Sequence, residues 1–128
     1  GGPEPPVGIS VPQAMYDDFV KISEPLQKIR PDYPFEVKVR EPRKRPTRMG
    51  GTDASVFAIE GVPTLGFTTE DFKGYDFDYG EIWHTERDLY TKNIPEYQEH
   101  TATVTAIIAL GVANLDKQLS REGLYTEE

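Results

Sequence analysis

The stretch from Gly50 to Asp88 reads GGTDASVFAIEGVPTLGFTTEDFKGYDFDYGEIWHTERD. It contains the single tryptophan of the chain and one of its two histidines. The leading glycines permit backbone conformations with positive φ and therefore predict a loop. Residues Ala54–Ile59 predict a short helix, and residues Val62–Phe67 predict a short buried strand. The alternation of helices and strands along the chain indicates a layered α/β fold.

Small and polar residues set the limits of this helix and strand. Thr52 or Asp53 is placed to cap the helix through a side-chain oxygen, and Gly61 is placed as its C-terminal stop. Pro63 cannot donate a hydrogen bond to a sheet, so it belongs at the start of the strand or on a sheet edge. Residues 68–79 are acidic and aromatic without a persistent period, which predicts a long loop of the kind that is usually functional.

Upstream of this stretch the sequence predicts a lead-in, a helix and a strand. Residues 1–9 are expected to be extended, and a helix is expected to begin near Ser10, which has capping-box spacing with Gln13. Pro25 should kink this helix or end its first half. Residues Phe35–Arg40 alternate between apolar and charged side chains, which predicts a strand with one buried face. Five apolar residues recur at steps of four and three and form the core-facing stripe of the helix: Met15, Phe19, Ile22, Leu26 and Ile29.

The only basic run, from Glu41 to Arg48, has two interpretations. It could be an anion-binding loop near a site. The favoured interpretation is a solvated loop whose prolines prevent regular structure, because runs of charge usually face solvent.

Downstream, the sequence predicts one long final helix that begins between Asn93 and Glu96. Gly123 is a plausible stop, and the tail from Leu124 to Glu128 is expected to fray. The apolar residues of this segment form a broad buried face: Val104, Ile107, Ile108, Gly111, Val112, Leu115 and Leu119. Residues 1–128 are expected to form a single partial domain, because two or three strands are few for an independent α/β sheet.

Composition narrows the range of functions. The chain has 128 residues and a net charge of −8, so it is a poor general binder of nucleic acid phosphates. It has no cysteine, which excludes disulfides, thiolate metal ligands and a cysteine nucleophile. The sequence contains no apolar run long enough to span a membrane and no signal peptide. It begins with Gly1 and lacks an initiator methionine, and we expect it to be part of a longer protein.

His84 is the first candidate for chemistry. Metal-binding imidazoles usually donate their second ring N–H to a carboxylate or carbonyl, and Asp88 lies four residues further on. One histidine and one aspartate also fit an ordinary loop. Asp53 is placed either to cap a helix or to orient a catalytic group. His100 is expected to be a structural residue on a helix surface. The sequence contains no G-x-S-x-G elbow and no glycine-rich phosphate loop.

Three motifs in order resemble a known family. Gly50 to Phe57, Gly61 to Thr64 and Trp83 to Asp88 are similar to the C-terminal part of the co-catalytic zinc exopeptidases, which include bacterial leucyl aminopeptidases and carboxypeptidase Q. The acidic and aromatic loop that ends at Tyr79 is most similar to the carboxypeptidase Q branch. Ala54 departs from the family, because many members have a histidine there, which would alter substrate contacts.

The resemblance implies a fold and a metal site. The fold would be the C-terminal portion of a three-layer α/β/α zinc-exopeptidase fold, with few strands flanked by helices. His84 would be the last of five zinc ligands and Asp88 its carboxylate partner. Asp53, Trp83 and Tyr79 would lie around the metal or the substrate pocket. The remaining four ligands and the glutamate base lie upstream in the family, in segments that this sequence does not contain.

These implications predict how the chain should behave. The intact parent would use two zinc ions to hydrolyse terminal peptide bonds, and the family suggests a secreted or periplasmic location. A single histidine cannot hold zinc tightly, so the 128-residue chain is expected to be inactive alone. Uncovered sheet edges predict self-association. Two alternatives remain open: a non-enzymatic α/β binding or assembly module, and a glutaminyl-cyclase-like zinc acyltransferase on the same fold.

Overall fold

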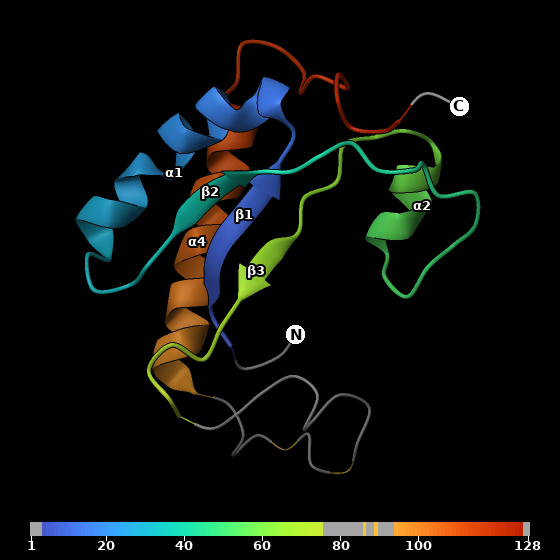
Figure 1. Cartoon of the computed structure of the whole chain (residues 1–128). Coiled ribbons are helices and arrows are strands. Elements are labelled where there is room, and N and C mark those ends of the chain that lie inside the picture. Colours follow the sequence, from blue (N-terminus) through green and yellow to red (C-terminus); the bar gives the residue numbers. More distant parts are fainter. Residues whose placement is uncertain (1–3, 76–85, 87–88, 90–93, 127–128) are drawn as a thin grey trace.

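The sheet is organised around strand β1 (Pro6–Val11), which lies between two other strands in the order β2-β1-β3. Strand β2 (Glu36–Val39) is parallel to β1, and strand β3 (Phe67–Thr69) is antiparallel to it. The computed structural model describes residues 4–75, 86, 89 and 94–126. These residues form a small mixed α/β domain with a three-stranded sheet and helices (Figure 1).

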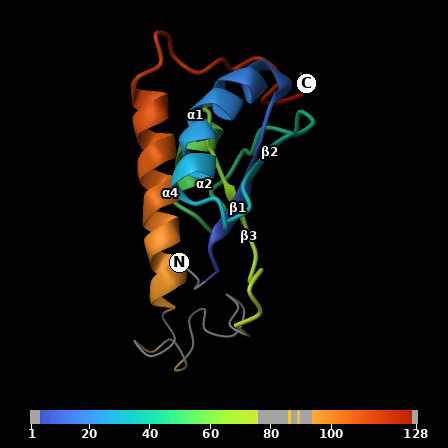
Figure 2. The same ribbon diagram turned by 90° about the vertical axis from the view of Figure 1, so that its left-hand side faces the viewer.

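Helices cover one face of this sheet. A short 3-10 turn, η1 (Gln13–Met15), leads into α1 (Tyr16–Ile29), and α4 (Pro95–Ala113) packs beside α1 on the same side (Figure 2). Helix α2 (Ala54–Ile59) lies beyond the β3 side of the sheet (Figure 1). The core lies between the sheet and the α1–α4 pair and is formed by Ile9, Val11, Met15, Phe19, Leu26, Val37, Val104, Ile108 and Leu124.

The strand register separates an apolar face from a polar one. Ile9 pairs with Val37, and both side chains are buried beneath the helices. Ser10 pairs with Lys38 and therefore belongs to the opposite face. Among the described residues no helix covers that opposite face, and its charged and hydroxyl side chains suit contact with water.

Gly111 allows α4 to approach α1 closely. A Cβ atom at this position would lie 2.9 Å from Cγ1 and 3.1 Å from Cβ of Ile22, and closer still to Cγ2. Real Cβ atoms avoid such distances, so the absence of a side chain at Gly111 sets the spacing of the two helices.

The expected helix start near Ser10 is wrong, and the extended segment before it is not merely a lead-in. Residues Pro6–Val11 form the central strand, and Ser10 lies inside it, so Ser10 does not cap a helix. The physical reason is that Ile9 and Val11, two residues apart, place β-branched side chains in the core. Pro12 then adopts an extended conformation with ψ of 154° and separates the strand from η1.

The core-facing stripe of the first helix is largely confirmed. Met15, Phe19 and Leu26 are buried, and Ile22 is partly buried against the core. Ile29 is the exception, with 57% of its surface exposed, because α1 ends there. The expectation that Pro25 ends the first half of the helix is wrong, since α1 continues through it to Ile29. The alternative, a kink at Pro25, stays a prediction.

The short helix after the glycine loop is confirmed, and so is its stop. The N–H of Gly61 donates to the carbonyl of Ala58, and the N–H of Val62 donates to that of Phe57. Together with a φ of 73° at Gly61, this is the Schellman motif that ends many helices. The predicted side-chain cap of α2 is wrong, because neither the Thr52 nor the Asp53 side chain accepts a hydrogen bond from the first backbone N–H groups of the helix. The predicted buried strand over Val62–Phe67 is wrong: the strand is β3 at Phe67–Thr69, it lies at the edge of the sheet, and Thr68 and Thr69 are exposed. Pro63 has no N–H to donate to a sheet and lies outside the strand.

The C-terminal expectations need two corrections. Helix α4 ends at Ala113, so Leu115, Leu119 and Gly123 lie beyond it. The tail does not fray at Leu124, whose side chain is part of the core and exposes only 2% of its surface. Tyr125 forms an isolated bridge with Arg43, and the Thr126 N–H donates to the Arg43 carbonyl. These backbone bonds hold the tail against the basic loop.

Candidate functional site

Four of the five sequence-predicted site residues, namely Tyr79, Trp83, His84 and Asp88, lie outside the described residues. Asp53 is the fifth, and it lies at the N-terminus of α2. It is exposed and has helical backbone angles, φ −61° and ψ −31°. The loop before α2 is held instead by Ser55, whose hydroxyl donates to the Thr52 carbonyl at 2.7 Å.

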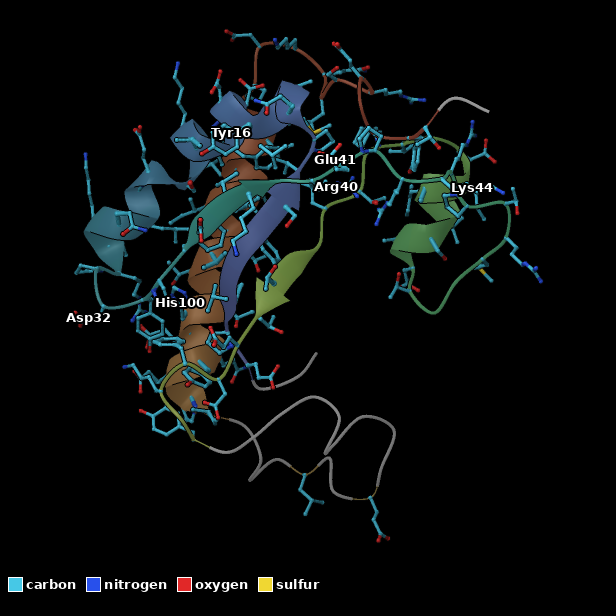
Figure 3. The ribbon with its side chains drawn as sticks, viewed as in Figure 1. Tyr16, Asp32, Arg40, Glu41, Lys44 and His100 are labelled. Carbon is cyan, nitrogen blue, oxygen red and sulfur yellow. The ribbon has the colours of Figure 1, made fainter. Side chains whose placement is uncertain are left out.

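A basic cavity of about 300 Å³ adjoins α2. Arg43, Lys44 and Pro46 of the basic loop form one wall, and Thr52, Ser55 and Ala58 form the other. Figure 3 shows this loop leaving the sheet after Arg40 and passing Lys44 beside α2. The basic residues of the loop are exposed, as the sequence predicts for a solvated loop.

Among the described residues, a group of titratable side chains linked by hydrogen bonds surrounds the first turn of α4, and we call it the Glu96 cluster. Its members are Tyr33, Asp71, Lys73, Tyr75, Glu96 and Tyr97. The Glu96 carboxylate accepts hydrogen bonds from the Tyr33 hydroxyl, the Lys73 ammonium and, at 2.9 Å, the Tyr75 hydroxyl. The neighbouring Tyr97 hydroxyl donates to Asp71 at 2.7 Å and accepts from the Lys73 backbone N–H at 3.0 Å.

These contacts shift the titration of the cluster in opposite directions. The hydrogen bonds from Lys73, Tyr33 and Tyr75 lower the pKa of Glu96 to about 2. Burial, followed by the hydrogen bond to Asp71, raises the pKa of Tyr97 to about 12. At neutral pH the carboxylate is therefore ionised and the phenol is neutral. The hydrogen bonds of Glu96 and Tyr97 connect the first turn of α4 to Tyr33 and to residues 71–75.

His100 lies one turn further along α4 and is almost completely buried, with 1% of its surface exposed (Figure 3). Its ring packs on Tyr33 at 4.1 Å between centroids, and among the described residues neither ring nitrogen has a partner with good hydrogen-bond geometry, although the Pro6 backbone lies near enough to affect its pKa. Burial lowers the pKa of His100, the Arg30 guanidinium adds to this effect, and the Pro6 backbone opposes it. The expectation that His100 lies on the helix surface is wrong. Its packing against Tyr33 in the interior agrees with the structural role expected for it.

A signal for this burial was present in the sequence. Tyr97, His100, Val104 and Ile108 recur at steps of three and four, so they lie on one face of α4. Extending the apolar stripe backward from Val104 would have placed His100 in the core. The Glu96 cluster had no comparable signal, because its members come from three separate segments.

The cluster connects two segments that flank the stretch with His84. Tyr75 precedes that stretch and Glu96 follows it, and the hydrogen bond between them brings the two flanks together. The residues between these flanks carry the candidate metal ligand.

The described residues do not themselves form a metal site or a membrane span. Within residues 4–75 and 94–126, no three histidine or carboxylate side chains come together in a way that could hold a metal ion. Among the same residues, no helix has the length and apolar character needed to cross a bilayer.

Comparison with known proteins adds no relative. Searches of protein-family models, of curated proteins and of solved structures find no match to this chain.

Proposed function

We propose that this chain is the C-terminal segment of a zinc-dependent metallo-exopeptidase, with His84 as a metal ligand and Asp88 as its carboxylate partner. The observation that carries the proposal is the order of three motifs, Gly50 to Phe57, Gly61 to Thr64 and Trp83 to Asp88. Local structure supports the first two motifs. The glycine loop is followed by α2 and a Schellman stop at Gly61, which fits the first motif and the start of the second, whereas β3 begins only at Phe67.

The proposal assigns most of the site to other parts of the parent protein. The described residues do not fit a zinc ion by themselves, since they supply no group of three ligands. Zinc in the parent would supply Lewis-acid chemistry and an activated water. Among the described residues, helices cover one face of the sheet, so the helix layer on the other face of an α/β/α fold would also come from the parent.

The first test uses the purified 128-residue chain with added zinc. We expect no metal-dependent hydrolysis of dipeptides or aminoacyl-anilides, because one histidine leaves the metal too few ligands. Turnover that disappears with a chelator would contradict the proposal.

The second test uses the parent protein. His84→Ala should abolish turnover and reduce the zinc content, and Asp88→Ala should cost about 10–100-fold in activity or zinc affinity. Glu86→Ala is the matched control, because it removes an exposed carboxylate from the same motif without touching a proposed ligand. Full activity in the His84 variant would refute the proposal. Release of ammonia from peptides with N-terminal glutamine, without peptide hydrolysis, would favour the glutaminyl-cyclase-like alternative.

A non-enzymatic binding module is the second candidate, and exposed apolar side chains on α2 favour it. Val56 and Phe57 expose 48% and 58% of their surface. If binding is the function, Val56→Ser with Phe57→Ser should abolish association with a partner, and His84→Ala should leave that association intact.

A further inference from the structure

An open cleft of about 610 Å³ lies between the end of α4 and the segment that follows α2. Its apolar lining includes Val62, Pro63, Val112, Leu115 and Leu119. The volume falls in the range of pockets that hold small organic ligands, roughly 300–1,000 Å³. Among the described residues, the cleft lining does not include Asp53, and the inference is argued without the exopeptidase proposal.

Two arginines converge beside this cleft. The position that a Cβ atom would occupy on Gly61 lies 3.5 Å from Nη1 of Arg121 and 3.7 Å from Nη1 of Arg45. Both guanidinium groups therefore lie within van der Waals distance of the same point beside Gly61.

The hydrogen bonds of this pair leave donors available for a ligand. Arg45 uses Nε and Nη2 on the carbonyl of Ile59, with Nε at 2.7 Å, and Nη1 is not part of that contact. Arg121 lines the cleft, and its side chain has no hydrogen bond or ion pair among the described residues. The two guanidinium groups carry like charges that a bound anion would neutralise, and their planar forks match a carboxylate.

We infer that this cleft binds an organic carboxylate with an apolar body, with the carboxylate between Arg45 and Arg121 and the apolar body against Val112 and Leu119. The rim also carries Asp116 and Lys117, whose opposite charges offset each other. A fatty acid and the free C-terminus of an apolar peptide share this chemistry.

The test follows the methyl resonances of Val112, Leu115 and Leu119 by NMR during titration. Octanoate, 1-octanol, acetyl-leucyl-leucine and its C-terminal amide are the probes, and all are added to the full chain at pH 7. Octanoate should shift these resonances saturably, and 1-octanol should bind at least about 10-fold more weakly because it has no charge for the arginines. Tighter binding of the peptide acid than of octanoate identifies a peptide ligand, and the reverse order identifies a fatty acid.

Arg121→Gln should weaken octanoate binding about 10-fold or more, since one charge-assisted contact is lost. Arg48→Gln is the matched control, because it removes an exposed positive charge from the same basic loop as Arg45 and should leave binding unchanged. Both substitutions are at exposed positions, and circular dichroism verifies that the variants remain folded. The inference is overturned if octanoate causes no shifts, if 1-octanol binds equally well, or if Arg121→Gln has no larger effect than Arg48→Gln.

Discussion

Substitution of Gly111 by alanine tests the packing of α4 on α1. A Gly-to-Ala change inside a helix normally stabilises a protein by about 0.5–1 kcal/mol. At position 111 the added methyl would lie 2.9 Å from Cγ1 of Ile22 and closer to Cγ2, so something must move. Overpacking of this kind typically costs about 1–3 kcal/mol. We expect Gly111→Ala to lower the free energy of unfolding by about 1–2 kcal/mol, because the steric cost exceeds the helix gain.

The same geometry predicts that the sign of the effect reverses when Ile22 is shortened. Ile22→Ala removes Cγ1 and Cγ2 and leaves only Cβ, at 3.1 Å from the new methyl. In that background Gly111→Ala should stabilise the chain by up to about 1 kcal/mol, because the helix propensity gain is no longer opposed by a large clash. A coupling of about 2 kcal/mol between the two sites is expected for residues in direct contact.

Urea unfolding followed by circular dichroism measures all four chains of this cycle. Thr105→Ala serves as the control, because Thr105 lies on the exposed side of α4 and its substitution should add about 0.5 kcal/mol in both backgrounds. Stabilisation of the chain by Gly111→Ala with Ile22 intact would refute the close approach of the two helices. Equal effects in both backgrounds would refute the contact between these residues.

Three further predictions concern the core and the Glu96 cluster. Because burial lowers the pKa of His100 from 6.5, the free energy of unfolding should fall as the pH drops below 6.5, by at most about 1.4 kcal/mol per pH unit. His100→Phe should remove this pH dependence in urea unfolding between pH 7 and 5. An unchanged pH dependence would contradict a buried, neutral ring. The pKa of Glu96 is lowered from 4.5 to about 2, so the stability that its ionised carboxylate contributes is lost as the pH falls from about 4.5 to about 2. The difference in free energy of unfolding between wild type and Glu96→Gln should therefore shrink from pH 5 to pH 2.5. A constant difference would contradict the hydrogen bonds to the ionised Glu96 carboxylate. Leu124→Ala should destabilise the chain by about 2–5 kcal/mol in thermal unfolding, whereas a frayed tail would give almost no change.

Local patterns in the sequence predicted much of the helical part of this fold. The spacing of Met15, Phe19 and Leu26 identified the buried side of α1, because a helix has a fixed period. Gly61 identified the end of α2, because few other residues tolerate its φ of 73°. Both features depend on a few neighbouring residues, and such features can be read from one segment alone.

Long-range pairing could not be predicted in the same way. Strand β1 was missed because its burial depends on β2 and β3 on either side, which are distant in sequence. Leu124 was missed because a short tail has no period, and its burial depends on core residues and on Arg43, which are distant in sequence. In the candidate site, Asp53 was correctly placed before α2, but its side chain does not cap the helix.

The composition of the core also has a kinetic consequence. Ile9 and Leu124 share one core although they lie near opposite ends of the sequence. During synthesis at roughly 5–20 residues per second, the central strand would leave the ribosome on the order of 5–20 s before the last core residue. Until then the apolar side of β1 lacks its final cover, and such transiently exposed strands are vulnerable to aggregation. Production at lower temperature, or together with a chaperone that binds apolar segments, should therefore raise the yield of soluble chain.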